Sequence, residues 1–331
     1  MRKNILLLFG GGGTEHEIST ISSKYIEKTI NDIGIYNIIK VEIGKDKVFR
    51  RVDSNDSTIE IVELNSKRQL VGKQILDIHF VIPCIHGPPG ETGEIQNYLE
   101  LISLPYLGCT PESSLICFNK VSSKLWFSAL NIPNTPFVFL SSLNEKNIAR
   151  DFFNIHKKVF VKAASQGSSV GCYQVTEIDS LNEALENAFK FSPYILIEKM
   201  LEARELEISV YEYEGKIITT IPGEIICPNK FYSFEEKYDQ NSRTTTEVVA
   251  KGLSDSIISQ MREYAHKAFV SLKLRHLSRI DFFYTKDNEL YLNEINTFPG
   301  MTPISMFPKM MENHGHSFKS FLSVIIEKNI L

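Results

Sequence analysis

Acidic and amide side chains recur in two strand-like stretches near the carboxyl end of the chain. The sequence RIDFFY spans residues 279–284 and ELYLNEIN spans residues 289–296. Because side chains alternate between the two faces of a strand, neighbouring strands here can put Asp281, Glu294 and Asn296 on one face. Such oxygen ligands suit Mg²⁺, which keeps several waters and often bridges to nucleotide phosphates. The pattern predicts a magnesium and nucleotide site, with solvent-facing strand residues as the alternative.

A lysine and a loop of small residues form the second candidate for nucleotide chemistry. In KAASQGSSVG, residues 162–171, Lys162 ends an apolar strand and small, flexible residues follow it. Backbone N–H groups and hydroxyls of such a loop can cover phosphate oxygens. The segment lacks the spacing GxxxxGKS or GxxxxGKT of a P-loop, so an ordinary loop with a surface lysine is the alternative.

The amino-terminal part of the chain alternates between strands and helices. Residues 4–9 read as a short buried strand that runs into four glycines, residues 10–13, and then into a helical pattern. Further strands are predicted at 35–43 and 77–87, the latter again ending in a glycine loop before a helix. This alternation predicts a parallel α/β layer, while the polar stretch 44–75 receives no assignment.

A proline- and glycine-containing connector, residues 104–114, precedes a helix that begins near Ser113 and places a domain boundary near residue 108. The strand and helix patterns between 137 and 200 predict a compact α+β unit. Beyond it we expect a hairpin around Glu214-Gly215.

The last third of the chain contains a long polar loop, a helix and a pair of strands. The loop, residues 223–247, is charged and suits a mobile lid over a reactive intermediate, with a plain surface loop as the alternative. An amphipathic helix follows over residues 257–272, and strands are predicted at 279–284 and 289–295. The carboxylate and amide candidates thus fall on this last pair of strands.

The bulk composition is that of a globular protein that acts on small ligands. The chain has 331 residues, 43% of them hydrophobic, and a net charge of -4, which gives no basic excess for nucleic acid or an anionic membrane. Its five cysteines form no CxxC pair, which fits a reducing cytoplasm. The apolar run at residues 5–9 is too short for a secretory signal, and we expect a cytoplasmic protein without membrane spans.

Five motifs together resemble one enzyme family. In chain order, GGGGTEHEIS, HGPPGETG, KAASQGSSVG, SRID and EINTFPGMT are similar to the D-alanine–D-alanine ligase family. The resemblance implies a three-domain ATP-grasp fold of α/β and α+β units, in which the first unit is a Rossmann-like domain with a parallel sheet. The implied divisions are an N-terminal substrate domain at 1–108, a central ATP-grasp domain at 109–200 and a C-terminal catalytic domain at 201–331.

The resemblance implies that ATP lies between the central and C-terminal domains. The residues implied to bind ATP are Lys120, Lys162, Glu198, Lys199, Leu201, Glu205 and Lys237. Among them, Glu198 and Leu201 would meet the adenine and Glu205 the ribose, while Lys120 and Lys162 would hold the phosphates. Two Mg²⁺ ions, with Mn²⁺ as an alternative, would be held by Asp281, Glu294 and Asn296.

The resemblance also implies a set of residues around the two amino acids. Those implied to act in catalysis are Glu15, Ser168, Tyr238, Arg279, Gly300 and Ser305. Those implied to bind substrate are Glu15, His86, Lys237, Arg279, Gly300 and Ser305. Glu15 would bind the ammonium of the first D-alanine and connect through Ser168 to Tyr238. Arg279 and the N–H of Gly300 would stabilise the oxyanion.

His86 would lie beside the substrates with a pKa near neutrality. Lys237 would contact the γ-phosphate, and Ser305 the carboxylate of the second D-alanine.

The implied function is ATP-dependent joining of two D-alanine molecules through D-alanyl phosphate, for bacterial peptidoglycan precursors and hence cell wall and cell shape. The implied partners are D-alanine, ATP and a second copy of the chain in a homodimer. Tyr238 favours the dipeptide over D-alanyl-D-lactate, because depsipeptide-forming relatives commonly carry another residue there. A D-alanine–D-lactate or D-alanine–D-serine ligase is the main alternative.

Two further alternatives belong to other classes. A dinucleotide-binding module is disfavoured because Gly10 to Gly13 do not form GxGxxG. A non-catalytic ATP-grasp protein is disfavoured because each matched metal and phosphate position carries a competent group. The chain departs from the family pattern at Thr92, where aspartate is usual, and in KAAS, where KPS is frequent, which leaves the geometry of both loops open.

Overall fold

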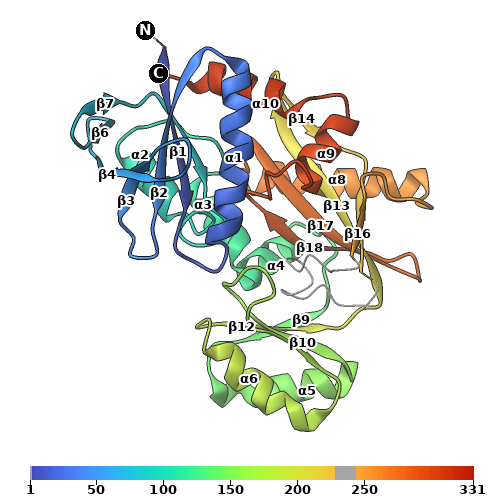
Figure 1. Cartoon of the computed structure of the whole chain (residues 1–331). Helices are drawn as coiled ribbons and strands as arrows, with labels where there is room; N and C mark the ends of the chain where they lie inside the picture. The colour runs from blue at the N-terminus through green and yellow to red at the C-terminus, as the bar shows by residue number, and fades with distance from the viewer. Residues whose placement is uncertain (1, 228–243) are drawn as a thin grey trace.

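The computed structural model describes residues 2–227 and 244–331 (Figure 1). Lys237 and Tyr238, which were expected in the lid, lie outside the described residues. Within the part of the chain that is described, no helix is long and apolar enough to cross a membrane. Three larger sheets and one small sheet organise these described residues.

The N-terminal sheet has the strand order β4-β3-β2-β1-β8. Its strands are β1 (Lys3–Gly10), β2 (Tyr36–Ile43), β3 (Phe49–Val52), β4 (Thr58–Ile61) and β8 (Phe80–Cys84). β1 is parallel to both β2 and β8, which confirms the predicted parallel layer. Ile5 to Phe9 are at most 1% exposed, because both faces of this central strand are covered.

The stretch 44–75, which received no assignment from sequence, is mostly β-structure. It contains β3, which is antiparallel to β2, β4, which is antiparallel to β3, and most of a small sheet. That sheet is made of β5 (Glu63–Leu64), β6 (Gln69–Val71) and β7 (Ile75–Asp77). These strands have two to four residues and many polar side chains, so they carry too little alternation to be recognised.

Capped helices lead from the first sheet to the next. The N-terminal unit contains α1 (His16–Ile33), which ends at the left-handed Gly34, and α2 (Glu94–Leu101). The helix predicted near Ser113 is α3 (Pro111–Phe118), whose first turn is capped by the Thr110 hydroxyl. α4 (Lys120–Ala129) follows at once, because the Asn119 side chain accepts hydrogen bonds from two N–H groups of its first turn.

The central sheet is antiparallel, in the order β11-β10-β12-β9, and forms the predicted compact α+β unit. Its strands are β9 (Phe137–Leu140), β10 (Val159–Ala163), β11 (Cys172–Val175) and β12 (Ile195–Lys199). Figure 1 shows α5 (Lys146–His156) and α6 (Leu181–Phe189) together on one face of it, each preceded by a 3₁₀ turn at Leu143–Glu145 and Ile178–Ser180. The buried face of these helices and this sheet form a separate hydrophobic cluster.

The third sheet has the order β16-β15-β13-β17-β18, with β14 also paired to β13. Its strands are β13 (Ala203–Tyr213), β14 (Lys216–Thr219), β15 (Gly223–Ile226), β16 (Thr245–Glu247), β17 (Leu277–Thr285) and β18 (Leu290–Asn296). The predicted hairpin is present, and both Glu214 and Gly215 have the positive φ of a tight hairpin turn. The amphipathic helix is α8 (Asp255–Ser271), which packs on this sheet.

The prediction of a loop over 223–247 is wrong at its two ends. Residues 223–226 form β15, which pairs with the long strand β13, and residues 245–247 form β16. Gly223 to Ile225 are buried in the sheet, so pairing with β13 overrides the local loop signals.

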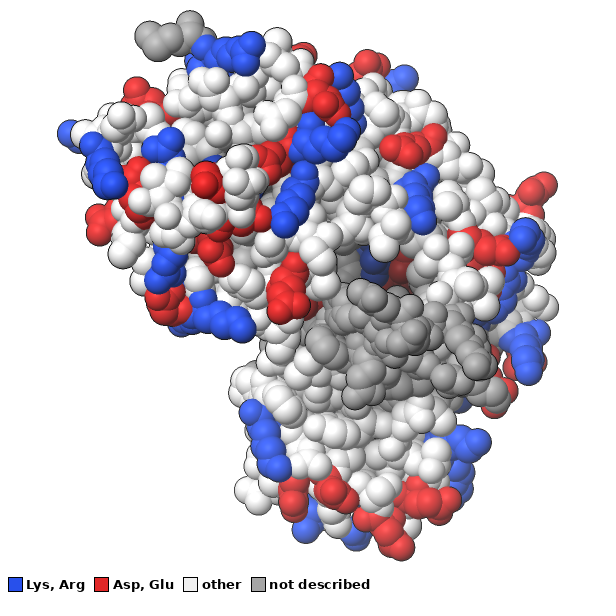
Figure 2. Space-filling view, viewed as in Figure 1, with Lys and Arg blue, Asp and Glu red and all other residues white. Residues whose placement is uncertain are grey.

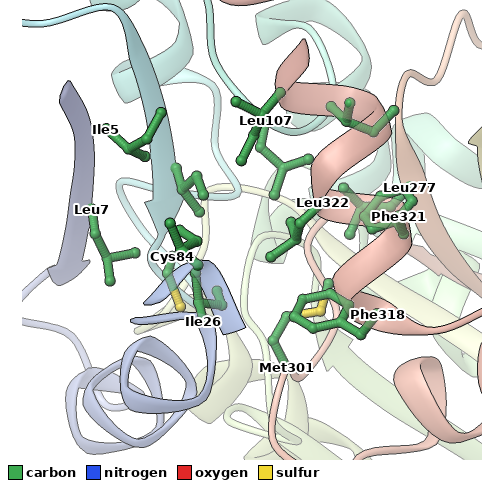
Figure 3. Close-up of a cluster of buried hydrophobic side chains, with 14 of the residues drawn as sticks. Ile5, Leu7, Ile26, Cys84, Leu107, Leu277, Met301, Phe318, Phe321 and Leu322 are labelled. Carbon is green, nitrogen blue, oxygen red and sulfur yellow. The ribbon is translucent and has the colours of Figure 1, made fainter. Parts of the chain in front are cut away.

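The first and third sheets share one hydrophobic core. Figure 3 shows Ile5 of β1 and Ile26 of α1 in the same cluster as Leu277 of β17 and Phe318 and Phe321 of α10 (Phe318–Asn329). The other C-terminal helix, α9 (Met306–Asn313), lies beside β13. These two sheets therefore hold each other in a fixed relation, while the central sheet has its own core. The proposed divisions near 108 and 200 stay predictions.

Candidate active site

The three larger sheets meet around one cavity of about 770 Å³. Its lining contains all the predicted site residues that the structure describes, namely Glu15, His86, Lys120, Lys162, Ser168, Glu198, Lys199, Leu201, Glu205, Arg279, Asp281, Glu294, Asn296, Gly300 and Ser305. Figure 2 shows a hollow on one face of the molecule, with atoms of Lys or Arg and of Asp or Glu visible inside it. Residues separated by almost 300 positions in sequence thus share one site.

The pairing of β17 with β18 sets the acidic wall of the cavity. Asp281 lies opposite Glu294, and Arg279 lies opposite Asn296, so these side chains share one face as the alternation predicted. Asn296 Nδ2 donates to Asp281 Oδ2 at 2.9 Å. The hairpin thus presents two carboxylates and one amide to the cavity.

Arg279 is held by two carboxylates at the same wall. Its Nε and Nη2 donate to the two oxygens of Asp281, each at 2.8 Å, and Nε lies 3.2 Å from Glu207 Oε1. Burial alone would lower the pKa of Arg279, but Asp281 and Glu207 outweigh it and raise this pKa well above its usual value. A permanently charged, oriented guanidinium therefore faces the cavity.

Two lysines and a buried glutamate form the basic wall. Lys120 Nζ donates to Gln166 O at 2.6 Å and lies 3.9 Å from Glu294 Oε2. Lys162 Nζ lies 2.5 Å from Glu198 Oε2. Burial alone would raise the pKa of Glu198, but Lys124 and Lys162 outweigh it and lower this pKa to about 2. Glu198 is therefore ionised, and its carboxylate is already paired with lysine side chains.

Sequence reasoning missed Lys124, whose Nζ lies 2.6 Å from Glu198 Oε1. Burial lowers the pKa of Lys124, an effect that Glu198 opposes. A signal was present: Lys124 follows Lys120 by four residues and so lies on nearly the same face of α4.

Glu15 reaches across the cavity from the start of α1. The helix gets no side-chain cap from it, and instead Ser168 Oγ donates to Glu15 Oε1 at 2.5 Å, the contact expected between these residues. Gly87 and Gly167 make room for the carboxylate, because a Cβ on them would lie 2.8 and 3.1 Å from Glu15 Oε2. Its position therefore depends on two glycines from separate loops.

His86 departs from its prediction. Its Nδ1 lies 3.2 Å from the carbonyl of Phe298 and its Nε2 lies 2.9 Å from Ser22 Oγ. A carbonyl only accepts, so Nδ1 carries the proton and Nε2 accepts from the serine. Burial lowers the pKa of His86, which corrects the expected near-neutral value: the imidazole is neutral and held by the protein.

Glu91 is a second residue that sequence reasoning missed, although it lies within HGPPGETG. Its Oε2 accepts the N–H of Gly87 at 2.7 Å, and it lines the cavity. Burial and then the charge of Glu15 raise the pKa of Glu91 to about 8. The carboxyl is therefore largely protonated at neutral pH.

The loop before α9 brings Gly300 and Ser305 together. Ser305 Oγ accepts from Thr302 N at 3.0 Å, and a Cβ on Gly300 would lie 2.9 Å from that hydroxyl. Gly300, expected to donate to the oxyanion, and Ser305, expected at the carboxylate of the second D-alanine, are thus neighbours.

The oxygen donors fit a hard divalent cation. Among the residues described, no group of three or more His, Cys, Asp or Glu side chains could hold a metal alone. Two carboxylates and an amide would therefore need water or phosphate oxygens to complete the coordination, which is the usual habit of Mg²⁺. This donor set suits a metal that arrives with a nucleotide.

Two family models match this chain: the D-ala D-ala ligase N-terminus over residues 4–109 and the D-ala D-ala ligase C-terminus over residues 126–327. The chain belongs to the D-alanine–D-alanine ligase family. Its fold is the ATP-grasp fold, as its structural relatives confirm, and its class is that of ATP-dependent ligases.

Relatives match this member of the ligase family over almost its full length. It is 53% identical to a D-alanine–D-alanine ligase from Shewanella pealeana, covering 97% of each chain. Among solved structures, D-alanyl-alanine synthetase A from Vibrio cholerae has a TM-score of 0.92 at 47% identity, covering 99% of this chain and 98% of its own. The VanG D-Ala:D-Ser ligase from Enterococcus faecalis has a TM-score of 0.88 at 26% identity and 99% coverage of both chains.

Proposed function

We propose that this chain joins two D-alanine molecules to D-alanyl-D-alanine, with conversion of ATP to ADP and phosphate, for peptidoglycan precursor synthesis. One observation carries the proposal: a single cavity contains the Lys120 and Lys162 ammonium groups, the Asp281 and Glu294 carboxylates, and the Glu15 carboxylate held by Ser168. These are a phosphate site, a metal site and an ammonium site within reach of one another. Relatives that are about 50% identical over nearly the whole chain are named D-alanine–D-alanine ligases. Their names support D-alanine, rather than D-serine, as the acceptor for this chain.

The nucleotide would bind along β12 and the start of β13. Lys120 and Lys162 would contact phosphates, and Glu205 the ribose. Because two lysines hold the Glu198 carboxylate, we propose that backbone groups of Glu198, Lys199 and Leu201 face the adenine. Lys237, outside the described residues, stays a predicted contact of the γ-phosphate.

A divalent metal would be held by Asp281, Glu294 and Asn296. When bound, two Mg²⁺ ions, with Mn²⁺ as an alternative, would neutralise phosphate charge and orient the γ-phosphoryl group. Lys120 Nζ lies 3.9 Å from Glu294 Oε2, so the lysine proposed for the phosphates and a carboxylate proposed for the metal are neighbours.

The amino acids would bind on the opposite side of the cavity. Glu15 would bind the first ammonium, while neutral His86 and the protonated Glu91 add no second negative charge there. The first carboxylate attacks the γ-phosphorus and the bond to ADP breaks, which gives D-alanyl phosphate. The amine of the second D-alanine, whose carboxylate meets Ser305, then attacks the acyl carbon.

The tetrahedral intermediate of the second step carries a new oxyanion. The Arg279 guanidinium and the Gly300 N–H would donate to it, and the intermediate collapses with release of phosphate. Arg279 needs no reorientation during this step, because Asp281 and Glu207 already hold it. Tyr238, outside the described residues, stays a predicted partner of Ser168.

We propose domains at 1–108, 109–200 and 201–331, a cytoplasmic location and a homodimer. The distribution of strands supports the domains: β1 to β8 lie in the first, β9 to β12 in the second and β13 to β18 in the third. α3 and α4 are the exception, since they also pack on the core of the third sheet. The odd number of five cysteines and the absence of a CxxC pair in the sequence support a reducing compartment. Analytical ultracentrifugation would test the dimer.

The test is ADP release with MgATP and D-alanine, L-alanine, D-serine, D-lactate or no acceptor. We expect release with D-alanine, and D-alanyl-D-alanine as the product by mass spectrometry. Hydroxylamine should trap the acyl phosphate as D-alanine hydroxamate. ADP release that is independent of D-alanine, or a product containing D-serine or D-lactate under equimolar competition, would rule the proposal out.

A further inference from the structure

The buried ammonium of Lys124 lies behind the nucleotide end of the cavity. It comes from α4, is 2% exposed and does not line the cavity, whereas its partner Glu198 does. Glu198 receives a lysine on each oxygen, Lys124 at 2.6 Å and Lys162 at 2.5 Å. The register of β10 and β12 explains the second contact, since Lys162 lies opposite Leu196 and thus diagonally from Glu198 on the same face.

The charges of this trio do not cancel. Lys162 with Glu198 alone would form a neutral pair and would offer little attraction to a polyphosphate. Lys124 adds a second positive charge, so the three groups together keep a net charge of +1 at the cavity wall. The short contacts to both carboxylate oxygens are those of ionised partners.

We propose that Lys124 is a positioning residue for ATP. Lys124 neutralises Glu198 from the side away from the cavity, and it thereby leaves the positive charge of Lys162 available to the nucleotide phosphates. The inference rests on the proposed function of the cavity. It assigns a role in ATP affinity to a residue that contacts no substrate.

A purely structural role explains these contacts less well. Burying a charged lysine costs free energy, and a buried ion pair seldom stabilises a fold more than apolar side chains of similar volume. Besides Glu198, Lys124 Nζ donates to the Thr135 carbonyl at 3.4 Å and lies 5.4 Å from the Phe137 ring centre. Neutral side chains at both Lys124 and Glu198 would fill this space without the cost of burying charge, so the charged pair itself calls for an explanation.

The experiment compares wild type with Lys124→Met, Lys124→Arg and the double variant Lys124→Met/Glu198→Gln. Kinetic constants for ATP and D-alanine come from ADP release, and thermal unfolding reports on folding. We expect Lys124→Met to raise the KM for ATP about tenfold, equivalent to about 1.4 kcal/mol, with the KM for D-alanine changed less than about twofold. Lys124→Arg, which keeps the charge, should stay within about threefold of wild type.

The double variant separates charge from packing. It removes one positive and one negative charge, so Lys162 again carries a net +1, and the KM for ATP should return towards the wild-type value. A folded Lys124→Met with an unchanged KM for ATP, or a double variant at least as impaired as Lys124→Met, overturns the inference.

If Lys124→Met does not fold, the double variant decides, since it has neutral groups in both places. A KM for ATP near that of wild type then supports the inference, and a tenfold increase overturns it. Wild type without D-alanine-dependent ADP release would instead contradict the proposed function.

Discussion

Replacing Arg279 by alanine separates the second chemical step from the first. The guanidinium faces the cavity and would donate to the oxyanion only when the amine attacks the acyl phosphate. Asp281 and Glu207 hold it in place from β17 and β13, with side chains 13% and 7% exposed. The substitution therefore removes an oxyanion donor and also leaves two carboxylates without this partner.

Both effects have an expected magnitude. Loss of one preorganised oxyanion donor lowers turnover by about 10²- to 10³-fold. Removing one partner of a buried ion pair costs about 3–5 kcal/mol, and the lower end applies here because the Arg279 side chain is 22% exposed. We expect Arg279→Ala to lower the rate of dipeptide formation at least about 100-fold and to lower the melting temperature, while Arg279→Lys keeps the charge and loses less of both.

Rapid-quench measurements of ADP and dipeptide provide the assay. Arg279→Ala should still release about one equivalent of ADP per site, from acyl phosphate formation, before dipeptide appears slowly. The matched control is Arg204→Ala on the same sheet, because Arg204 binds both Glu224 oxygens, at 2.7 and 2.6 Å, outside the cavity. It should leave turnover within about twofold. Dipeptide formation by Arg279→Ala within tenfold of wild type, or equal slowing of ADP release and dipeptide formation, would refute the assignment.

Three further changes test other parts of the site. Because the pKa of Glu91 is raised from 4.5 to about 8, the stability that this carboxyl contributes is present below pH 4.5 and lost as pH rises through about 8. Glu91→Gln should therefore raise the melting temperature, relative to wild type, more at pH 8.5 than at pH 5. Equal effects at the two pH values would contradict a protonated carboxyl. Gly87→Ala puts a Cβ 2.8 Å from Glu15 Oε2 and should raise the KM for D-alanine about tenfold or more. The control Gly215→Ala is also at positive φ, but its Cβ would have no atom within 4 Å, so it should lower only stability. Equal KM values for D-alanine in the two variants would argue against a steric effect on Glu15. Glu294→Gln should raise the Mg²⁺ concentration needed for half-maximal ADP release, and EDTA should abolish wild-type activity reversibly; an unchanged Mg²⁺ dependence would exclude Glu294 as a ligand.

The parts of the fold that sequence predicted are those that short-range chemistry controls. The apolar run of β1, the proline- and glycine-containing connector before α3 and the turn at Glu214-Gly215 each signal their structure within a few residues. The strands of 44–75 escaped because they have only two to four residues and many polar side chains, and β15 at the start of the 223–247 loop escaped because it depends on pairing with β13. Local pattern carries little of that information.

The sequence by itself determined which chemical groups are present and which of them share a strand face, as for Asp281 and Glu294. Motif order then supplied the family. Only the tertiary structure decided the ionic states and partners: two lysines on Glu198, a raised pKa for Glu91 and a neutral, fully bonded His86. The physical reason is that desolvation and ion pairing depend on atoms brought together from distant parts of the chain, and these distances are set only when the three sheets pack around one cavity.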